Sequence, residues 1–413
     1  MATRKTDARE RAYDVVLYGA TGFVGRQTVD YFAAHAGGLR WALAGRSAEK
    51  LAAVRCACGA PGAGLIVADA NDADALDALA SQARVVLSTA GPFALYGSAL
   101  VAACVARRTH YVDITGETPW VRQMIERHHE QAAADGTRIV PGCGFDSVPS
   151  DLGAFLVVQA LRERHDQACA EVKACFSMRG GLNGGTLASL LNILDTGLDK
   201  DLADPFLLNP AGSRPADAAV HADPYAPHHD ADFDAWLGPF VMGPINTRVV
   251  RRSAALIDGD LYAPGFAYQE YLRFGRGAVA ALAAAGTSVA AGAGQGALRF
   301  GAVRQLARRL APGPGQGPSQ RSMDGGSFRC ELIGRGSRGA VVRGRIADRG
   351  DPGNRATTKF VCESALALAL DGPALPGGAA LGGVLTPASA LGKVLAHRLA
   401  AAGMTIEPIP DKL

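Results

Sequence analysis

Three glycines spaced three residues apart follow a short apolar run near the start of the chain, a pattern that suits phosphate binding. Gly19 permits a tight exit from a strand expected over residues 15–17. Gly22 lets backbone N–H groups approach a pyrophosphate, and Gly25 lets the next helix, expected over residues 23–36, pack closely and direct its positive end toward the phosphate. The residues expected to contact a dinucleotide are Gly19, Ala20, Thr21, Gly22, Phe23, Val24 and Gly25. A flexible loop is the alternative for such a triplet taken alone.

A second expected strand, over residues 39–47, ends where the adenosine ribose of a dinucleotide would lie. Sites that prefer NAD commonly place Asp or Glu there to bind the ribose 2′-hydroxyl. This chain instead has Arg46, whose guanidinium suits a 2′-phosphate, followed by Ser47 and, one helical turn later, Lys50. These residues predict NADP(H) as the cofactor. The alternative is that Arg46 and Lys50 form the solvated first turn of a helix.

Alternating strand and helix patterns continue to residue 141 and predict a doubly wound sheet of six strands. The remaining strands are expected over residues 65–69, 85–88, 110–112 and 138–141. Asp69 and Asn71 lie at the carboxyl end of the third strand, where adenine-binding groups belong in this architecture, although Asn71 and Asp72 are equally suited to capping the next helix. A turn of small residues after the fourth strand would lie beside the nicotinamide ribose, and it consists of Thr89, Ala90, Gly91 and Pro92.

The overall composition excludes several classes of protein. A net charge of +3 on 413 residues, without a long block of Lys or Arg, argues against nucleic-acid binding. The first 13 residues have no apolar core, so they predict no signal peptide or anchor, and we expect a cytoplasmic protein. The eight cysteines are scattered and predict reduced thiols rather than a zinc site. A segment rich in His and Asp, residues 209–234, is interpreted as a surface loop or lid rather than a metal site.

The second half of the chain predicts an α+β domain built on a mostly antiparallel sheet. Residues 171–178 alternate between apolar and polar side chains, as in a half-buried antiparallel strand. A glycine-rich loop over residues 180–186 is a candidate wall of the substrate site. We expect an α/β protein with these parts: a tail (1–13), a Rossmann domain with a doubly wound parallel sheet (14–146), an α+β substrate and dimerisation domain (147–370), and a C-terminal segment that packs back on the first domain (371–413).

Several motifs resemble those of the saccharopine dehydrogenase-like NADP-binding oxidoreductases, and more closely their bacterial branch named trans-acting enoyl reductases. The matching segments span nearly the whole chain, and they are GATGFVG at 19–25, AGRS at 44–47, AGPF at 90–93, YVDITGE at 111–117, PGCGFDSVPSD at 141–151 and GDPG at 350–353. The resemblance implies a Rossmann fold, NADP(H) use and reductase chemistry. It leaves the substrate open.

The chemistry implied by this resemblance is hydride delivery from NADPH to an activated, acyl-linked double bond. Reducing an enoyl thioester needs a hydrogen-bond donor to the developing enolate oxygen and a proton source for the α-carbon. Tyr96, just past the fourth strand, could supply the first. The other candidates lie at the ends of the fifth and sixth strands, and they are Asp113, Glu117, Cys143 and Asp146. The structural alternatives are that Asp113 and Asp146 hold turns and that Cys143 is a small buried thiol.

Residues 277–298 carry no charge and are followed by an arginine-rich stretch, residues 299–310. The first run is long enough to span a membrane, but its Ala and Gly content argues against spanning. In the second stretch, four apolar residues share one side of a helix while three arginines lie off it: Phe300, Val303, Leu306 and Leu310, with Arg304, Arg308 and Arg309. This composition suits a helix on an anionic membrane surface. A surface helix with its apolar stripe on the core is the equal alternative.

Three classes of function remain open from the sequence. The first is a lipid-linked enoyl reductase, the second a saccharopine-type reductase of an amino-acid imine, and the third a non-catalytic NADP(H)-binding protein at lipid surfaces. A compact dicarboxylate would need clustered Arg or Lys in loops of the second domain, and residues 180–186 offer only the neighbouring Arg179, which weighs against the second class. The expected partner is a small-molecule or acyl-lipid substrate, with contact to the inner membrane face and a homodimer as open alternatives.

Overall fold

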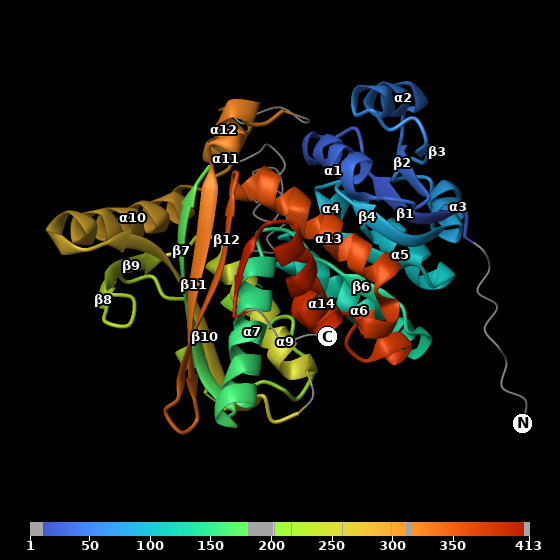
Figure 1. The fold of residues 1–413 in the computed structure, drawn as a ribbon. Coiled ribbons are helices and arrows are strands. Elements are labelled where there is room, and N and C mark those ends of the chain that lie inside the picture. The colour runs from blue at the N-terminus through green and yellow to red at the C-terminus, as the bar shows by residue number, and fades with distance from the viewer. Residues whose placement is uncertain are drawn as a thin grey trace, which may run out of the picture.

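The computed structural model describes residues 11–180, 201, 203–215, 217–257, 259–298, 300–310 and 316–408. Two seven-stranded sheets dominate this part of the chain, and helices cover and separate them (Figure 1). Apart from Gly180, the glycine-rich loop expected over residues 180–186 lies outside the described residues.

The first sheet is built mainly by the N-terminal part of the chain, and all its paired strands run parallel. Its order is β13-β6-β5-β4-β1-β2-β3, so the doubly wound sheet of six strands predicted from the sequence is confirmed. The strands are β1 (Tyr13–Tyr18), β2 (Trp41–Gly45), β3 (Gly64–Val67), β4 (Ala83–Ser88), β5 (His110–Asp113), β6 (Arg138–Val140) and β13 (Gly383–Val384). In the central strand β1, Val15, Val16 and Leu17 are all fully buried because helices cover both faces.

The seventh strand, β13, comes from the C-terminal part of the chain and was not in the predicted sheet. Gly383 and Val384 pair in parallel with Arg138 and Ile139 of β6. The side chain of Arg138 also donates to the carbonyl oxygen of Pro376 at 2.7 Å, which ties the C-terminal part to this edge. A strand of two residues has no periodic pattern, so the sequence could not indicate it.

Helices cover both faces of the first sheet. Those that follow its strands are α1 (Phe23–His35), α2 (Ala48–Ala57), α3 (Ala73–Gln82), α4 (Phe93–Tyr96), α5 (Ser98–Arg107) and α6 (Thr118–Asp135). One face carries α3 and α5, and the other carries α1 and α13 (Thr357–Leu370). The helix α13 therefore belongs to the layer between the two sheets (Figure 1).

The second sheet has the order β14-β12-β11-β7-β10-β9-β8. Only the pair β7 and β10 is parallel among its described strand pairs, which confirms a mostly antiparallel second sheet. Its strands are β7 (Cys169–Arg179), β8 (His228–Asp230), β9 (Ala235–Pro239), β10 (Tyr262–Gly275), β11 (Ser327–Gly336), β12 (Val341–Arg349) and β14 (Thr405–Glu407). The helix α7 (Val148–His165) packs on β11 and β12, and α9 (Gly243–Leu256) packs on β10.

The alternation predicted for residues 171–178 is confirmed on the inner side of β7, where Val172, Ala174 and Phe176 are fully buried. Two side chains differ from the prediction. Met178 is 42% exposed because it lies near the end of the strand, and Cys175, expected on the polar side, is buried. Cys175 packs in a small cluster on the outer face, together with Phe233, Ala235, Leu237, Tyr271 and Ile333.

The remaining elements connect the sheets or extend from them. They are η2 (Ala218–His221), α10 (Gly277–Leu298), α11 (Gly301–Leu310), α12 (Gln320–Asp324), η3 (Pro352–Ala356), η4 (Gly372–Ala374), η5 (Gly378–Ala380) and α14 (Pro387–Ala401). The C-terminal part contributes to both sheets, since β13 pairs with β6 and β14 pairs with β12.

The segment over residues 209–234, predicted as a surface loop or lid, is anchored to α9 at several points. Asn209, His221 and Asp230 are buried. Asp223 forms an ion pair with Arg248 of α9, and the carbonyl oxygen of His221 accepts a hydrogen bond from Arg251 at 2.8 Å. These contacts follow because buried guanidinium groups require carboxylate and carbonyl partners, which this segment supplies.

Candidate active site

The glycine turn after β1 has the backbone geometry that phosphate binding requires. Gly19 has φ +84°, in the left-handed region, and a Cβ there would lie 2.9 Å from the backbone nitrogen of Ala90. A Cβ at Gly25 would lie 2.1 Å from the carbonyl oxygen of Gly19, so α1 packs directly on the turn. A Cβ at Gly22 would meet only that same oxygen, at 3.2 Å, among the described atoms. Gly19 and Gly25 therefore shape the turn, and Gly22 leaves room for a pyrophosphate.

The N-terminus of α1 faces this space. Gly22 is its N-cap, and no described side chain caps it, so the first N–H groups can bind an anion. Ala20 and Val24 are buried, whereas Thr21 and Phe23 are partly exposed. Gly317, in the segment between α11 and α12, lies against Phe23, because a Cβ at Gly317 would be 2.4 Å from the phenyl ring. Gly317 therefore borders the phosphate site.

The ribose end of the site has the cation that the sequence predicts. Arg46 follows β2 directly and is exposed, and its guanidinium has no hydrogen bond or ion pair to the part of the chain that the structure describes. The hydroxyl oxygen of Ser47 accepts from the backbone nitrogen of Lys50 at 3.3 Å and so caps α2. Asp69 is half-buried, and burial together with the Asp69 charge raises the pKa of Tyr18 to about 12. Arg46 is thus the group most open to a 2′-phosphate.

Replacing Arg46 with alanine should weaken NADPH binding by about 1–3 kcal/mol and leave NADH binding nearly unchanged, because only NADPH carries the 2′-phosphate. Titration of both cofactors measures this difference. Arg40→Ala is a matched control, since Arg40 precedes β2 at its opposite end and its side chain is 51% exposed. Equal losses for NADPH and NADH in the Arg46 variant would contradict the assignment.

The nicotinamide end is organised by Glu117, whose role the sequence did not indicate. Its buried carboxylate accepts hydrogen bonds from the backbone nitrogens of Phe93, at 2.7 Å, and Ala94, at 2.9 Å. These are the first N–H groups of α4, so Glu117 caps that helix from 23 and 24 residues away. On the other side of the same turn, the hydroxyl of Thr89 donates to the carbonyl oxygen of Gly19 at 3.3 Å. The Thr89–Pro92 turn is therefore held against the glycine turn and α4.

Asp113 and Cys143 are fully buried at the ends of β5 and β6. One carboxylate oxygen of Asp113 accepts from the backbone nitrogens of Thr115 and Gly142, both at 2.9 Å, and the other accepts from the hydroxyl of Tyr111. Burial raises the pKa of Asp113 to about 7. The Cys143 thiol donates to the carbonyl oxygen of Val140 at 3.3 Å, and burial raises its pKa. Because both side chains are enclosed, we assign them to positioning the loops rather than to contact with a substrate.

Tyr96 and Asp146 are the two candidate residues that are not fully buried. Tyr96 ends α4 and is 41% exposed. Asp146 lies in the loop between β6 and α7 and is partly exposed, and burial of its carboxyl raises its pKa to about 6. Its Oδ2 would lie 3.4 Å from a Cβ at Gly116, so the glycine makes room for it. The catalytic roles of these two residues stay predictions.

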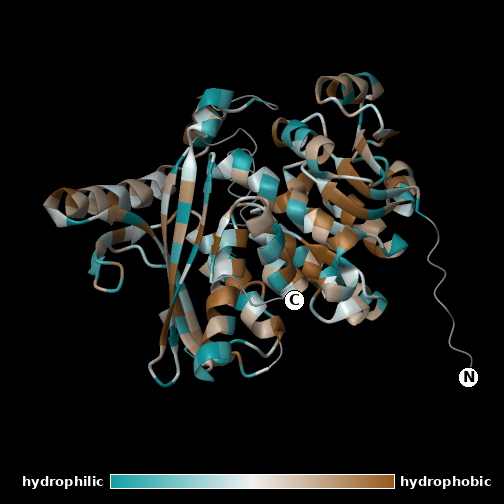
Figure 2. Cartoon of the chain, in the orientation of Figure 1, coloured by the Kyte–Doolittle hydropathy of each residue, from teal (hydrophilic) through white to brown (hydrophobic). Residues whose placement is uncertain are grey.

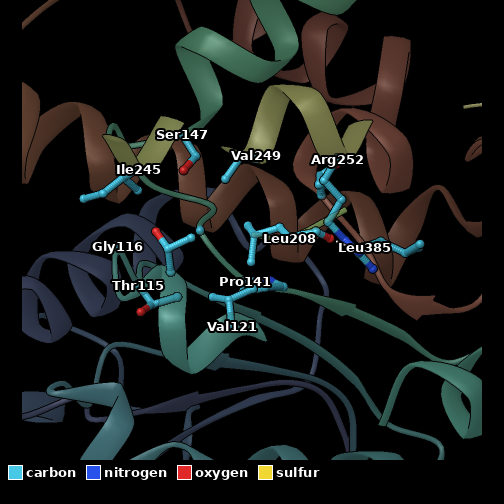
Figure 3. Close-up of a pocket in the computed structure, with 13 residues that line it drawn as sticks. Thr115, Gly116, Val121, Pro141, Ser147, Leu208, Ile245, Val249, Arg252 and Leu385 are labelled. Carbon is cyan, nitrogen blue, oxygen red and sulfur yellow. Dashed lines mark hydrogen bonds between the residues drawn. The ribbon is translucent and has the colours of Figure 1, made fainter. Parts of the chain in front are cut away.

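A cavity of about 20 Å³ lies between α9 and the loops that follow β5 and β6 (Figure 3). Its lining includes Ser147 from the loop before α7, Thr118 from the start of α6 and Arg252 from α9, with apolar side chains around them. The Ser147 and Thr118 hydroxyls and the Arg252 Nε have no hydrogen-bond partner among the described residues. Ligand pockets typically measure roughly 300–1,000 Å³, so this cavity has room for a water molecule but not for a substrate.

Three arginines of α9 are almost fully buried, and the sequence analysis did not single them out. Arg248 pairs with Asp223, while Arg251 and Arg252 donate mainly to backbone carbonyl oxygens, including those of Pro205 and Val384. Burial lowers the pKa of both Arg251 and Arg252 to about 10. Their guanidinium groups fix neighbouring segments and are already engaged, so they do not form an open site for a dicarboxylate.

Comparisons with known proteins show which family the sequence matches. The family model described as the saccharopine dehydrogenase NADP binding domain matches residues 15–140. A trans-acting enoyl reductase of Mycobacterium tuberculosis is 40% identical over 96% of this chain and 98% of its own length. The chain belongs to the trans-acting enoyl reductases of the saccharopine dehydrogenase-like family. A trans-acting enoyl reductase of Mycobacterium leprae is 39% identical over 96% of this chain and 98% of its own length. An apo saccharopine dehydrogenase (L-Glu forming) from Saccharomyces cerevisiae, a solved structure, has 15% identity and a TM-score of 0.49 over 96% of this chain and 99% of its own.

Family membership makes this protein an oxidoreductase with NADP(H) as its cofactor. The residues present fit that cofactor. The open space at Gly22 suits the pyrophosphate, and the exposed Arg46 suits the 2′-phosphate. The other predicted contacts line the same edge of the sheet, because Asp69 follows β3 and Thr89–Pro92 follow β4.

Proposed function

We propose that the protein reduces the double bond of an enoyl group carried by an acyl-linked lipid, with NADPH supplying the hydride. The observation that carries this proposal is the pairing of an NADP-type glycine turn and Arg46 with two polar residues, the exposed Tyr96 and the partly exposed Asp146, at the same carboxyl edge of the first sheet. The relatives named trans-acting enoyl reductases support the reaction class.

The two groups have complementary roles in this proposal. The Tyr96 hydroxyl donates a hydrogen bond to the thioester oxygen as it gains enolate character. Asp146 gives a proton to the α-carbon, a role that its raised pKa of about 6 favours because a general acid works best when its pKa is close to the working pH. Glu117 orients Tyr96 by capping α4, and Asp113 fixes the loops after β5 and β6.

Reduction of an amino-acid imine is the competing function. A dicarboxylate substrate would need exposed guanidinium or ammonium groups near the edge of the first sheet. The clustered arginines of α9 are buried and engaged with protein oxygens, so they favour the enoyl substrate over the imine.

An acyl-lipid substrate would bring the protein to a membrane surface, and we extend the proposal to peripheral contact with such a surface. The described part of the predicted stripe supports it, because Phe300 is 68%, Val303 36% and Leu306 56% exposed rather than packed on the core. The side chains of Leu310 and Arg308 lie outside the described residues.

The test is to incubate the purified protein with NADPH and a series of enoyl thioesters, and in parallel with the imine of an amino acid and a keto acid. We expect NADPH oxidation matched by saturated acyl product, rising with acyl chain length because longer chains bury more apolar surface. Mass spectrometry of the product identifies the reduced bond. Cofactor binding without turnover of any enoyl thioester, or turnover of the imine alone, would contradict the proposal.

A further inference from the structure

We infer that α10 and α11 together form a docking arm, residues 277–310, that lies flat on an anionic lipid bilayer. A docked arm would place the enzyme at its acyl-lipid substrate, and in this respect the inference rests on the proposed function. The evidence for the docking itself is the exposure, packing and charge of the arm.

The first observation is the exposure of α10. It is the one described helix whose length and composition would suffice to cross a membrane, yet only 11% of its apolar window, Gly277–Gly294, is buried. Its largest side chains point outward, with Val279 82%, Leu282 74% and Val289 72% exposed. Figure 1 shows α10 extending from the second sheet on the side away from the first sheet, and Figure 2 shows its largely apolar colouring. An apolar surface of this kind on a folded protein marks an interaction site.

The second observation is how α10 is attached. Its small residues face the protein, where Ala280 and Ala284 are buried. A Cβ at Gly238 of β9 would lie 3.6 Å from the carbonyl oxygen of Ala284, so the helix runs close along that strand. Just before the helix, Arg276 forms an ion pair with Asp234. A helix fixed along a strand presents one side to its surroundings, so it lies on a bilayer rather than crossing it.

The third observation is the charge around the arm. Residues 277–323 contain five arginines, with no Asp, Glu or Lys. In α11, Arg304 and Arg309 lie beside the exposed Phe300 and Leu306. Apolar side chains that enter the acyl boundary and arginines that meet anionic headgroups are the two components of interfacial binding.

The same charge argues against a second copy of the chain as the occupant. A two-fold interface places the same patch of each subunit against its partner, which would bring the arginines of α11 together without acidic side chains on the arm to neutralise them. Anionic lipid carries the charge opposite to that of these arginines. Beyond α11, Gly317 lies against Phe23 at the phosphate turn, so a docked arm would hold the cofactor edge close to the lipid.

Flotation with vesicles tests the arm. The full-length protein should co-float with vesicles that contain phosphatidylglycerol, bind phosphatidylcholine vesicles less, and detach as salt increases. The Arg304→Glu/Arg309→Glu variant should lower the vesicle partition coefficient at least tenfold. Val279→Ser/Leu282→Ser should lower it as well while keeping the salt dependence. The control Arg127→Glu/Arg164→Glu changes two exposed arginines on α6 and α7 and should bind like the parent.

Reductase activity on a short, water-soluble enoyl thioester separates this inference from the proposed function. All arm variants should retain that activity, because none of the changed residues lies at the cofactor edge. Vesicle binding without reductase activity would contradict the proposed function but would still support the docking inference. Three results would contradict the docking inference: the parent protein binds no vesicles, the arm variants bind vesicles as well as the control does, or Val279→Ser/Leu282→Ser converts a dimer to a monomer.

Discussion

Gly22→Val should abolish NADPH binding in a protein that still folds. The backbone of Gly22, at φ −69° and ψ 172°, is in a region that any residue adopts. A Cβ there needs only a small shift of the Gly19 carbonyl oxygen, 3.2 Å away, and the isopropyl group would then occupy the space reserved for the pyrophosphate. We expect at least a hundredfold loss of affinity by calorimetric titration, with an unchanged circular dichroism spectrum.

Two further glycine variants separate the loss of cofactor binding from damage to the fold. Gly38→Val is the matched control, because Gly38 follows α1, has no atom within 4 Å of a Cβ and does not have a positive φ. It should bind NADPH normally. Gly25→Ala should instead damage the turn itself and lower the melting temperature, because its Cβ would lie 2.1 Å from a carbonyl oxygen. Normal NADPH binding by Gly22→Val would place the cofactor elsewhere.

The cofactor half of the site could be predicted from the sequence because its determinants are local. Gly19, Gly22 and Gly25 occur within one turn, and Arg46 follows a strand whose residues are all apolar or glycine. In a parallel sheet, strand ends meet at one edge, so local motifs after successive strands assemble without knowledge of long-range contacts. The structure accordingly places these motifs together.

The other half depends on contacts that no local pattern encodes. Glu117 was a candidate acid, but its partners are N–H groups more than 20 residues earlier in the chain. Asp113 was a candidate as well, and its link to Gly142 supports the alternative that it holds a turn. The buried arginines of α9 look like surface residues in the sequence, since a helix with Arg248, Arg251 and Arg252 would ordinarily turn them to water. Their burial is explained only by the segment that contains His221 and Asp223, which packs over them.

The stripe on α11 shows a different limit of sequence analysis. Core packing and membrane docking both require apolar residues on one side of a helix, so periodicity alone cannot separate them. The observed exposure of Phe300 and Leu306 shows that these two side chains do not serve the core, because a stripe that serves the core would be buried.

Asp146→Asn should lower kcat by about 10²–10⁴-fold, the usual contribution of a general acid, if Asp146 supplies the proton to the α-carbon. The pH profile gives the sharper test. Burial disfavours the charged carboxylate and raises the pKa of Asp146 from 3.8 to about 6. The acid form is therefore abundant below pH 6 and is lost above it, so kcat/KM of the parent should fall as pH rises through about 6. In Asp146→Asn, which has no titrating group there, this fall should be absent.

Tyr96→Phe separates the proton donor from the group that binds the enolate oxygen. It should also reduce kcat, because the hydrogen bond to the oxygen is lost, but the fall in kcat/KM through about pH 6 should remain, since Asp146 is intact.

The pKa of Asp146 in the folded protein can also be checked without measuring activity. Because the neutral carboxyl is favoured in the folded protein, its contribution to stability is complete below about pH 4 and is lost as pH rises through about 6, so the melting-temperature difference between parent and Asp146→Asn should shrink over that range. A parent profile that is flat around pH 6, together with a fully active Asp146→Asn, would assign Asp146 to holding its loop and leave the proton to come from solvent.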